Sequence, residues 1–206
     1  MQTIAKYKTE EVRNEFPKLV ATLILEMEES LENGTGSDVL GTFYEMHLYR
    51  KGAAQYFTPW PICQLMAHCL PCKQEENEEP MRVVDPCCGS GRMLLANALA
   101  NGKEHYYYGI NIDHTCVKMA AINLFLNGVF HSEVMCADAL SPNDFRMSYA
   151  ISFLPFGIFR IENKEQSRLW HMHVNSFKRK QSILPDLKLP SEDGTPVSNG
   201  SQLQLF

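Results

Sequence analysis

The chain has 206 residues, 45% of them hydrophobic and 21% charged, with a formal net charge of −5 at pH 7. The composition is typical of a globular protein, and the length suffices for one α/β domain with a core. We expect the chain to be too short for an enzyme domain joined to a full target-recognition domain. The negative charge excludes a surface that coats DNA broadly, because duplex affinity comes largely from cations that neutralise phosphates. Any DNA contact is therefore expected to be local and weak for the chain alone.

Cysteine usage indicates a reducing cytoplasm, and hydropathy indicates no membrane-spanning segment. The seven cysteines are odd in number and scattered through apolar segments, unlike the disulfide framework of a secreted protein. Cys69 and Cys72 form a lone CxxC pair without a second pair at zinc-ribbon spacing, so we expect thiols and no metal site. No stretch approaches the roughly 18 apolar residues of a membrane span, and the amino terminus lacks the apolar run of a signal peptide, so we expect no membrane contact.

Helices come first along the chain. Apolar residues recur at helical spacing from about residue 8 to 32, and the pattern stops at Asn33 and Gly34. Further helical patterns cover 38–49 and 61 to about 70. Strands are then predicted at 81–85, 106–110, 134–137 and 149–153, alternating with helices at 91–101 and 114–127 and a short one at 142–146. This alternation predicts a mostly parallel sheet with right-handed crossovers.

The last part of the chain carries a basic cluster and a tail. A helix is predicted at 164–173, and residues 184–200 are rich in Pro, Ser, Asp and Gly, which favours a flexible tail. The cluster consists of Arg160, Lys164, Arg168, Lys178, Arg179, Lys180 and Lys188, with His171 and His173 between them. It is the candidate DNA contact, and a solvated helical face is the alternative.

An apolar strand pattern runs into an acid and a glycine-rich turn at residues 83–91. Asp85 ends the strand, and Gly89, Ser90 and Gly91 stand just before a helical pattern. In an open α/β sheet, ligands bind at the carboxyl ends of the strands, and glycines let the backbone approach the ligand closely. A purely structural turn after a strand is the alternative interpretation. The turn therefore marks the candidate site of a nucleotide-like cofactor.

Further short motifs follow in order along the chain. They are Gln55-Tyr56-Phe57-Thr58-Pro59, the turn just described, Gly109-Ile110-Asn111-Ile112-Asp113, Ala137-Asp138-Ala139 and Phe153-Leu154-Pro155-Phe156-Gly157. The series resembles the S-adenosylmethionine-dependent adenine-N6 DNA methyltransferases, especially the modification subunits of type I restriction systems, over roughly residues 38 to 160. The resemblance implies a Rossmann-like α/β fold, truncated relative to the family, with added N-terminal helices. We expect a helical segment over 1–50, a cofactor-binding domain over 51–160, and a basic helix with a flexible tail over 161–206.

The resemblance also implies which residues hold S-adenosylmethionine. Phe57, Thr58 and Pro59 match the segment that closes over the methionine moiety, although aromatic residues there are also typical of a core. Gly89, Ser90 and Gly91 match the turn that faces the methionine end, with Asp85 beside it. The acid that normally binds the ribose hydroxyls is replaced by Asn111, with Asp113 two residues on. Asp138 matches the acid that reads the adenine amino group, and its alternative role is a helix cap.

The catalytic motif departs from the family pattern. The family activates the target amine with an Asn or Asp, two prolines and a stacking aromatic ring, and here these positions are Phe153, Leu154, Pro155 and Phe156. Phe153 has no acceptor atom for the amine, whereas Pro155 and Phe156 are retained. The resemblance therefore implies impaired catalysis by the chain alone.

Residues 202–206 match the QLxLF pentapeptide with which bacterial replication and repair proteins dock on the sliding clamp. Leu205 and Phe206 would fill an apolar pocket and Gln202 would fix the register, with Leu203 between them. The alternative is that these residues pack on their own domain.

Three functions therefore remain open. The first is an S-adenosylmethionine-binding protein of the adenine-N6 DNA methylase family with impaired catalysis, carried by a bacterium or its mobile elements. The second is a non-catalytic adaptor docked on the sliding clamp. The third is an active methyltransferase that needs a specificity or methylase partner subunit.

Overall fold

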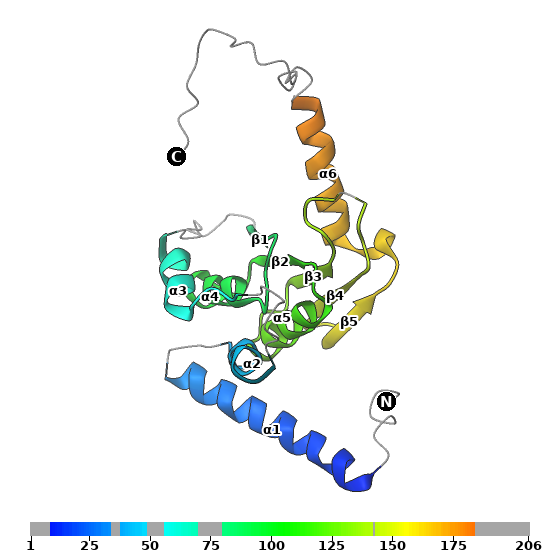
Figure 1. Ribbon diagram of the computed structural model, residues 1–206. Coiled ribbons are helices and arrows are strands. Elements are labelled where there is room, and N and C mark those ends of the chain that lie inside the picture. Colours follow the sequence, from blue (N-terminus) through cyan, green and yellow to red (C-terminus); the bar gives the residue numbers. More distant parts are fainter. Residues whose placement is uncertain (1–8, 34–37, 49–55, 70–79, 142, 184–206) are drawn as a thin grey trace, which may run out of the picture.

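The computed structural model describes residues 9–33, 38–48, 56–69, 80–141 and 143–183 (Figure 1). Helices precede the sheet: α1 (Glu10–Glu32), α2 (Val39–Phe43), the π-helical turn η2 (Tyr44–Leu48) and α3 (Trp60–Cys69). The helices expected at 8–32, 38–49 and 61–70 are thus confirmed within a few residues. Gln55, Cys72, Lys188 and residues 202–206 lie outside the described residues.

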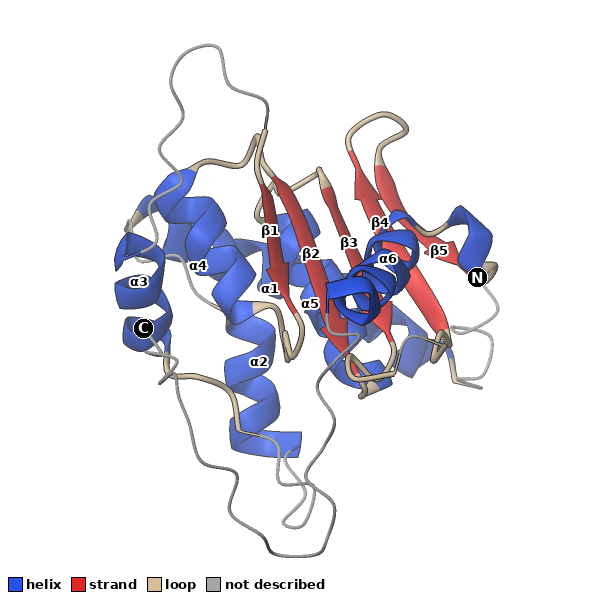
Figure 2. Cartoon of the chain, turned by 90° about the horizontal axis from the view of Figure 1, so that it is seen from above, coloured by secondary structure: helices blue, strands red, loops and turns tan. Residues whose placement is uncertain are grey.

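The chain then forms a five-stranded sheet with order β1-β2-β3-β4-β5 (Figure 2). The elements are β1 (Arg82–Asp85), α4 (Arg92–Asn101), β2 (Tyr106–Asn111), α5 (His114–Leu126), β3 (Ser132–Cys136), β4 (Met147–Ser152), β5 (Gly157–Ile161), the 3-10 turn η3 (Lys164–Gln166) and α6 (Arg168–Ile183). The α/β class and the four expected strands are confirmed. β5 was not expected, and α6 runs ten residues beyond the helix end predicted at residue 173.

The prediction of a mostly parallel sheet is wrong for its second half. β1, β2 and β3 are parallel, but β4 pairs antiparallel with β3, and β5 pairs antiparallel with β4. Only residues 137–146 connect β3 to β4, and the short helix expected at 142–146 is absent from the described residues 143–146. A parallel crossover needs about a dozen or more residues, usually with a helix, so this short connection favours an antiparallel return.

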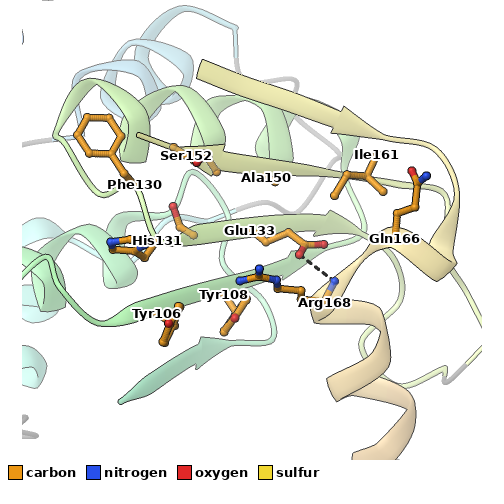
Figure 3. A pocket seen from close by; sticks show the side chains of 12 residues that line it. Tyr106, Tyr108, Phe130, His131, Glu133, Ala150, Ser152, Ile161, Gln166 and Arg168 are labelled. Carbon is orange, nitrogen blue, oxygen red and sulfur yellow. Dashed lines mark hydrogen bonds between the residues drawn. The ribbon is translucent and has the colours of Figure 1, made fainter. Parts of the chain in front are cut away.

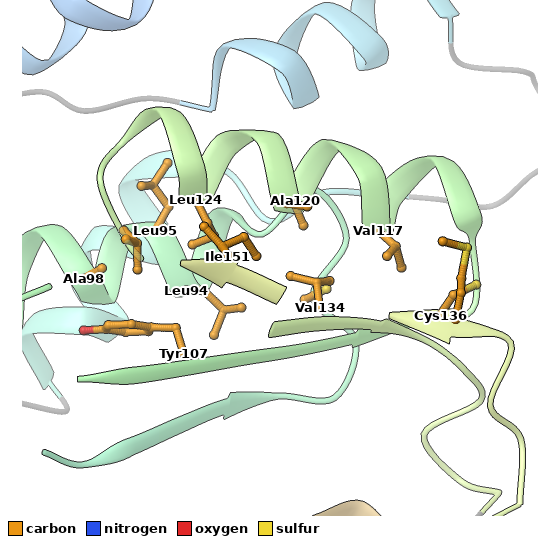
Figure 4. Close-up of a cluster of buried hydrophobic side chains, with 14 residues drawn as sticks. Leu94, Leu95, Ala98, Tyr107, Val117, Ala120, Leu124, Val134, Cys136 and Ile151 are labelled. Atoms are coloured by element: carbon orange, nitrogen blue, oxygen red, sulfur yellow. The ribbon is translucent and has the colours of Figure 1, made fainter. Parts of the chain in front are cut away.

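Helices cover both faces of the sheet. The connections from β1 to β2 and from β2 to β3 both lead to the next strand on the same side. Because both are right-handed crossovers, α4 and α5 lie on one face of the sheet. There Leu94, Leu95, Val117 and Leu124 pack against Tyr107 and Val134 in the main core (Figure 4). On the other face α6 packs through Leu169 against Tyr108, Ile110 and Met135. Among the helices that the structure describes, none combines the length and apolar character needed to cross a membrane.

Candidate functional site

The carboxyl ends of the three parallel strands lie side by side at one edge of the sheet. The register pairs Asp85 with Gly109, and Asn111 with Cys136, so Asp85, Asn111 and the loop that holds Asp138 line up across β1, β2 and β3. A groove of about 770 Å³ opens there, with Asn111 and Asp138 in its wall. This volume falls within the range of about 300–1,000 Å³ that is usual for small-molecule sites.

A second groove of about 420 Å³ lies between β1 and the helices α3 and α4, and Thr58 and Asp85 line it. The two grooves meet at Val84, Pro86 and Cys87, which line both. Four of the expected cofactor residues therefore line a groove, Asn111 and Asp138 on one side of the loop that follows β1 and Thr58 and Asp85 on the other, whereas Phe57, Pro59 and Asp113 line neither groove.

The turn after β1 is built from two left-handed glycines. Gly89 has φ +53° and Gly91 has φ +83°, a region that residues with a Cβ atom rarely adopt. A Cβ atom on Gly89 would stand 2.9 Å from Cδ1 of Phe57, so the glycine also lets the Phe57 ring lie against the turn. The segment expected to close over the ligand is thus next to the glycine turn. None of Gly89, Ser90 and Gly91 lines either of the two grooves.

Part of the turn faces the protein interior. Ser90 is fully buried, and its hydroxyl donates to the carboxylate of Asp38, 52 residues earlier in the chain. The amide of Gly91 donates to the carbonyl of Cys88 at 2.8 Å, and the amide of Cys88 donates to the carbonyl of Ile110 at 2.9 Å. These two amides hold the shape of the turn and are not directed at a ligand.

Asp85 is a half-buried carboxylate at the end of β1. Its Oδ1 accepts a hydrogen bond of 3.0 Å from the amide of Cys87. Burial raises the pKa of Asp85, and the hydrogen bond from Cys87 opposes the shift. An acid in these surroundings gains from a cationic or hydrogen-bonding ligand group that offsets its desolvation.

The polar residues after β2 and β3 already have local roles. Oδ1 of Asn111 accepts from the amide of Asp113 at 2.8 Å. Asp113 caps α5, because its Oδ1 accepts from the amides of Thr115 and Cys116 at 2.6 and 3.0 Å. Asp138 accepts from the amide of Leu140 at 2.9 Å within its own loop. Asn111 and Asp138 still line the groove, whereas the contacts of Asp113 are those of a helix cap.

Sequence reasoning missed a buried polar centre beneath the turn. Asp38 is 1% exposed and accepts hydrogen bonds from the hydroxyl of Ser90, from Nε of Arg92 at 2.9 Å and from Nδ2 of Asn123 at 2.6 Å. These donors come from the turn, α4 and α5, so one carboxylate joins three parts of the site. Arginine after the second glycine of a cofactor turn was the available signal, since a buried guanidinium requires an acidic partner.

Sequence reasoning also missed that α6 forms one wall of the larger groove. Met172, His173, Ser176 and Phe177 of α6 line it opposite the loops after β2 and β3. The helix is anchored by Glu133 of β3, a carboxylate that is only 4% exposed. Glu133 accepts from the hydroxyls of Ser148 and Ser167. It also accepts from the first amides of α6, including that of Arg168 at 3.1 Å (Figure 3). The signal in the sequence was an acid directly before the apolar strand predicted at 134–137.

The degenerate catalytic motif lies elsewhere. Phe153, Leu154, Pro155 and Phe156 form the hairpin loop between β4 and β5, closed by the pairing of Ser152 with Gly157. Because Ile151 pairs with Ser132 at the start of β3, this hairpin lies at the amino end of the parallel strands. Its rings contact Phe125 and Phe130 with centroid distances of 4.9 to 5.7 Å. The structure therefore does not bring Pro155 and Phe156 together with the cofactor residues.

The basic cluster is dispersed over several elements. Arg160 on β5 pairs with Glu162 at 3.1 Å, and Nζ of Lys164 lies 5.0 Å from the centre of the Trp170 ring. Arg168 begins α6 and lines a separate pocket of about 240 Å³ on the face of the sheet that α6 covers (Figure 3). The alternative of a solvated surface accounts for Arg160 and Lys164, whose contacts are local.

Comparison with known proteins confirms the family that the sequence resembles. The family described as N-6 DNA Methylase matches residues 35–182. The type I restriction enzyme MpnII methylase subunit of Mycoplasma pneumoniae is 29% identical over 150 residues, which cover 67% of this chain and 27% of that protein. The chain thus spans about a quarter of that relative's length. No solved structure matches. Because the family match covers well over half of this chain, the chain belongs to the N-6 DNA methylase family.

Proposed function

We propose that this protein binds S-adenosylmethionine at the carboxyl edge of β1, β2 and β3 and does not methylate adenine on its own. The observation that carries the proposal is the alignment of Asp85, Asn111 and Asp138 across three parallel strand ends, beside a turn of two left-handed glycines. Open α/β sheets bind ligands at this edge. Family membership supports the choice of ligand.

The residues present suit the parts of such a ligand. The carboxylate of Asp85 can accept from the ligand's ammonium group, which would offset the burial that raises the pKa of Asp85. Asn111 and Asp138 offer polar groups in a groove whose walls are mostly apolar, such as Ile110, Ile112 and Leu169, as an adenosine moiety requires. Bound S-adenosylmethionine would supply an activated methyl group.

Calorimetric titration with S-adenosylmethionine and with its demethylated product tests this proposal. We expect saturable heat with the wild type and at least about a tenfold loss of affinity in Asn111→Ala and Asp138→Ala, because each removes a polar contact worth on the order of 1 kcal/mol or more. Glu162→Ala is the matched control, since that side chain is 74% exposed just after β5 and lines neither groove. Absence of heat with the wild type at millimolar ligand would refute cofactor binding.

Impaired catalysis is supported by two features of the hairpin Phe153–Phe156. Phe153 offers no acceptor to a target amine. The hairpin also lies at the opposite edge of the sheet from Asp85 and the glycine turn. We propose that methyl transfer to DNA requires groups from a partner subunit that also contacts the DNA. The description of the Mycoplasma pneumoniae relative as a methylase subunit supports a partner.

The second candidate function is docking on the bacterial sliding clamp. It is supported by the sequence of residues 202–206, in which Gln202, Leu203, Leu205 and Phe206 match the docking pentapeptide. A fluorescent peptide of this sequence should gain anisotropy with purified clamp, at micromolar affinity or roughly 8 kcal/mol. In the full chain, deletion of Leu205 and Phe206 should abolish clamp binding and leave the melting temperature unchanged. A lower melting temperature, with no anisotropy change of the peptide, would show that these residues pack on their own domain.

A further inference from the structure

Arg92, at the start of α4, connects the glycine turn to the two segments that precede it. The residue is 6% exposed, and its guanidinium uses most of its donors. Nε donates to Asp38 at 2.9 Å, Nη2 donates to Glu45 at 3.0 Å, and Nη1 donates to the carbonyl of Thr58 at 3.0 Å. A planar guanidinium with fixed donor directions constrains all three partners at once.

Phe57 is held from two sides by the same group of residues. Its amide donates to Oε1 of Glu45 at 3.3 Å, while Oε2 of Glu45 accepts from Arg92. The guanidinium carbon of Arg92 lies 5.5 Å from the centre of the Phe57 ring, a cation–π distance. Phe57 in turn lies against Gly89. Glu45 and Arg92 therefore fix both the backbone and the ring of the residue that covers the turn.

The two acidic partners of Arg92 differ in burial. The side chain of Asp38 is 0% exposed, whereas that of Glu45 is 36% exposed on the five-residue turn η2. Asp38 is also bound by Ser90 and Asn123, so removing it would disturb the core. Removing the Glu45 carboxylate leaves the buried pair of Asp38 and Arg92 in place. Glu45 is thus the member of the network that can change the position of Phe57 at little cost in stability.

We infer that Glu45 and Arg92 are positioning residues that hold Phe57, Thr58 and Pro59 over the glycine turn, so that the segment Val39–Leu48 sets the ligand affinity of the site. The inference rests on the proposed binding of S-adenosylmethionine. It adds that a segment outside the two grooves controls this binding through one half-exposed carboxylate.

The test compares Glu45→Ala and Glu45→Gln with Met46→Ala, a control on the neighbouring residue, which is 67% exposed. Calorimetry with S-adenosylhomocysteine should show affinity about tenfold weaker for Glu45→Ala, because Phe57 is then held in its position over the turn only about a tenth of the time. Glu45→Gln should recover part of the affinity, since its amide oxygen can still accept from the amide of Phe57. Met46→Ala should bind as the wild type does, and the melting temperatures of all four proteins should agree within a few degrees.

Hydrogen exchange gives a second measurement that needs no ligand. In Glu45→Ala, peptides that cover residues 56–62 should exchange faster, while peptides from α5 should be unchanged. A merely structural role would raise exchange in both. Unchanged exchange at 56–62, or wild-type affinity in Glu45→Ala, would overturn the inference. If the wild type itself fails to bind, the proposed function is refuted, and the exchange result then decides alone whether Glu45 holds the segment.

Discussion

Asp85 carries a charge where burial opposes it, which links the site to pH. Its pKa is raised in the folded protein, mainly by desolvation. The folded state therefore holds the proton more tightly than the unfolded state. The resulting stability is fully present below the unfolded pKa and is lost as pH rises through the raised folded pKa. Above that range the ionised Asp85 lowers the stability of the folded protein, but its negative charge is available to bind the ammonium group of a ligand.

We therefore predict that Asp85→Asn is more stable than the wild type at pH 7 and binds S-adenosylmethionine more weakly. The amide oxygen of Asn can still accept from the amide of Cys87, so the turn should persist. Urea unfolding at pH 4 to 8 measures the stability of both proteins. As pH rises, the free energy of unfolding of the wild type should fall relative to that of Asp85→Asn, because only the wild type loses the proton of Asp85. A variant less stable than the wild type at pH 7 would contradict this account.

Cysteine reactivity reports on the same loop. Cys87 is exposed and lines both grooves, whereas Cys88 and Cys116 are buried. Burial, with the nearby charge of Asp113, raises the pKa of Cys116 to about 12, so its thiolate fraction at pH 8 is about one in ten thousand. Burial raises the pKa of Cys88 as well.

We predict that iodoacetamide at pH 8 labels Cys87 and Cys69 rapidly and leaves Cys88 and Cys116 unlabelled, as peptide mass mapping can show. S-adenosylhomocysteine should slow the labelling of Cys87 severalfold. Cys69, which is exposed on α3 and lines neither groove, is the internal control. Equal labelling of Cys87 with and without ligand would argue against a ligand at this loop.

A buried acid anchors the start of α6, in addition to the apolar packing of Leu169. Glu133 accepts from two hydroxyls and from the amides of Arg168 and Leu169, so its charge is fully hydrogen-bonded. Ser167 adds a cap, because its hydroxyl accepts from the amide of Trp170 at 3.0 Å. Polar contacts at the first turn of the helix therefore help to hold the wall of the larger groove.

We predict that Glu133→Ala lowers the free energy of unfolding by on the order of 3 kcal/mol, because it leaves several buried donors without an acceptor. Ser167→Ala should cost about 1 kcal/mol as a lost helix cap. Glu162→Ala removes only an exposed ion pair with Arg160 and should cost between about 0 and 1 kcal/mol. Urea unfolding measures all three, and equal losses for Glu133→Ala and Glu162→Ala would contradict the anchoring role.

The antiparallel return of β4 separates the hairpin Phe153–Phe156 from the cofactor edge. We predict that Phe153→Asn with Leu154→Pro does not restore methyl transfer to DNA, although it restores the family's motif. Transfer of labelled methyl groups from S-adenosylmethionine to duplex DNA measures this, with a known adenine methyltransferase as positive control and a melting curve to show that the variant folds. Transfer by the double variant above background would show that the hairpin reaches the ligand.

The local patterns of the chain foretold much of this architecture. Hydrophobic periodicity located three leading helices and four strands, because burial on one face imposes a period of 3.6 or 2 on the sequence. Gly89 and Gly91 marked the turn, since only glycine readily takes their backbone angles. The order of short motifs indicated the family, which the match over residues 35–182 shows.

Contacts between distant residues could not be foretold in the same way. The bonds of Asp38 to Ser90 and Asn123 span 52 and 85 residues, and no local period encodes them. The direction of β4 depended on the length of one connection, and it moved Phe153 to the far edge of the sheet. Asp113 could be assigned as a helix cap only once its contacts were visible. Sequence patterns indicate which segments form helices, strands and turns, because periodicity and backbone angles are local, whereas the packing of strands and helices decides which residues meet.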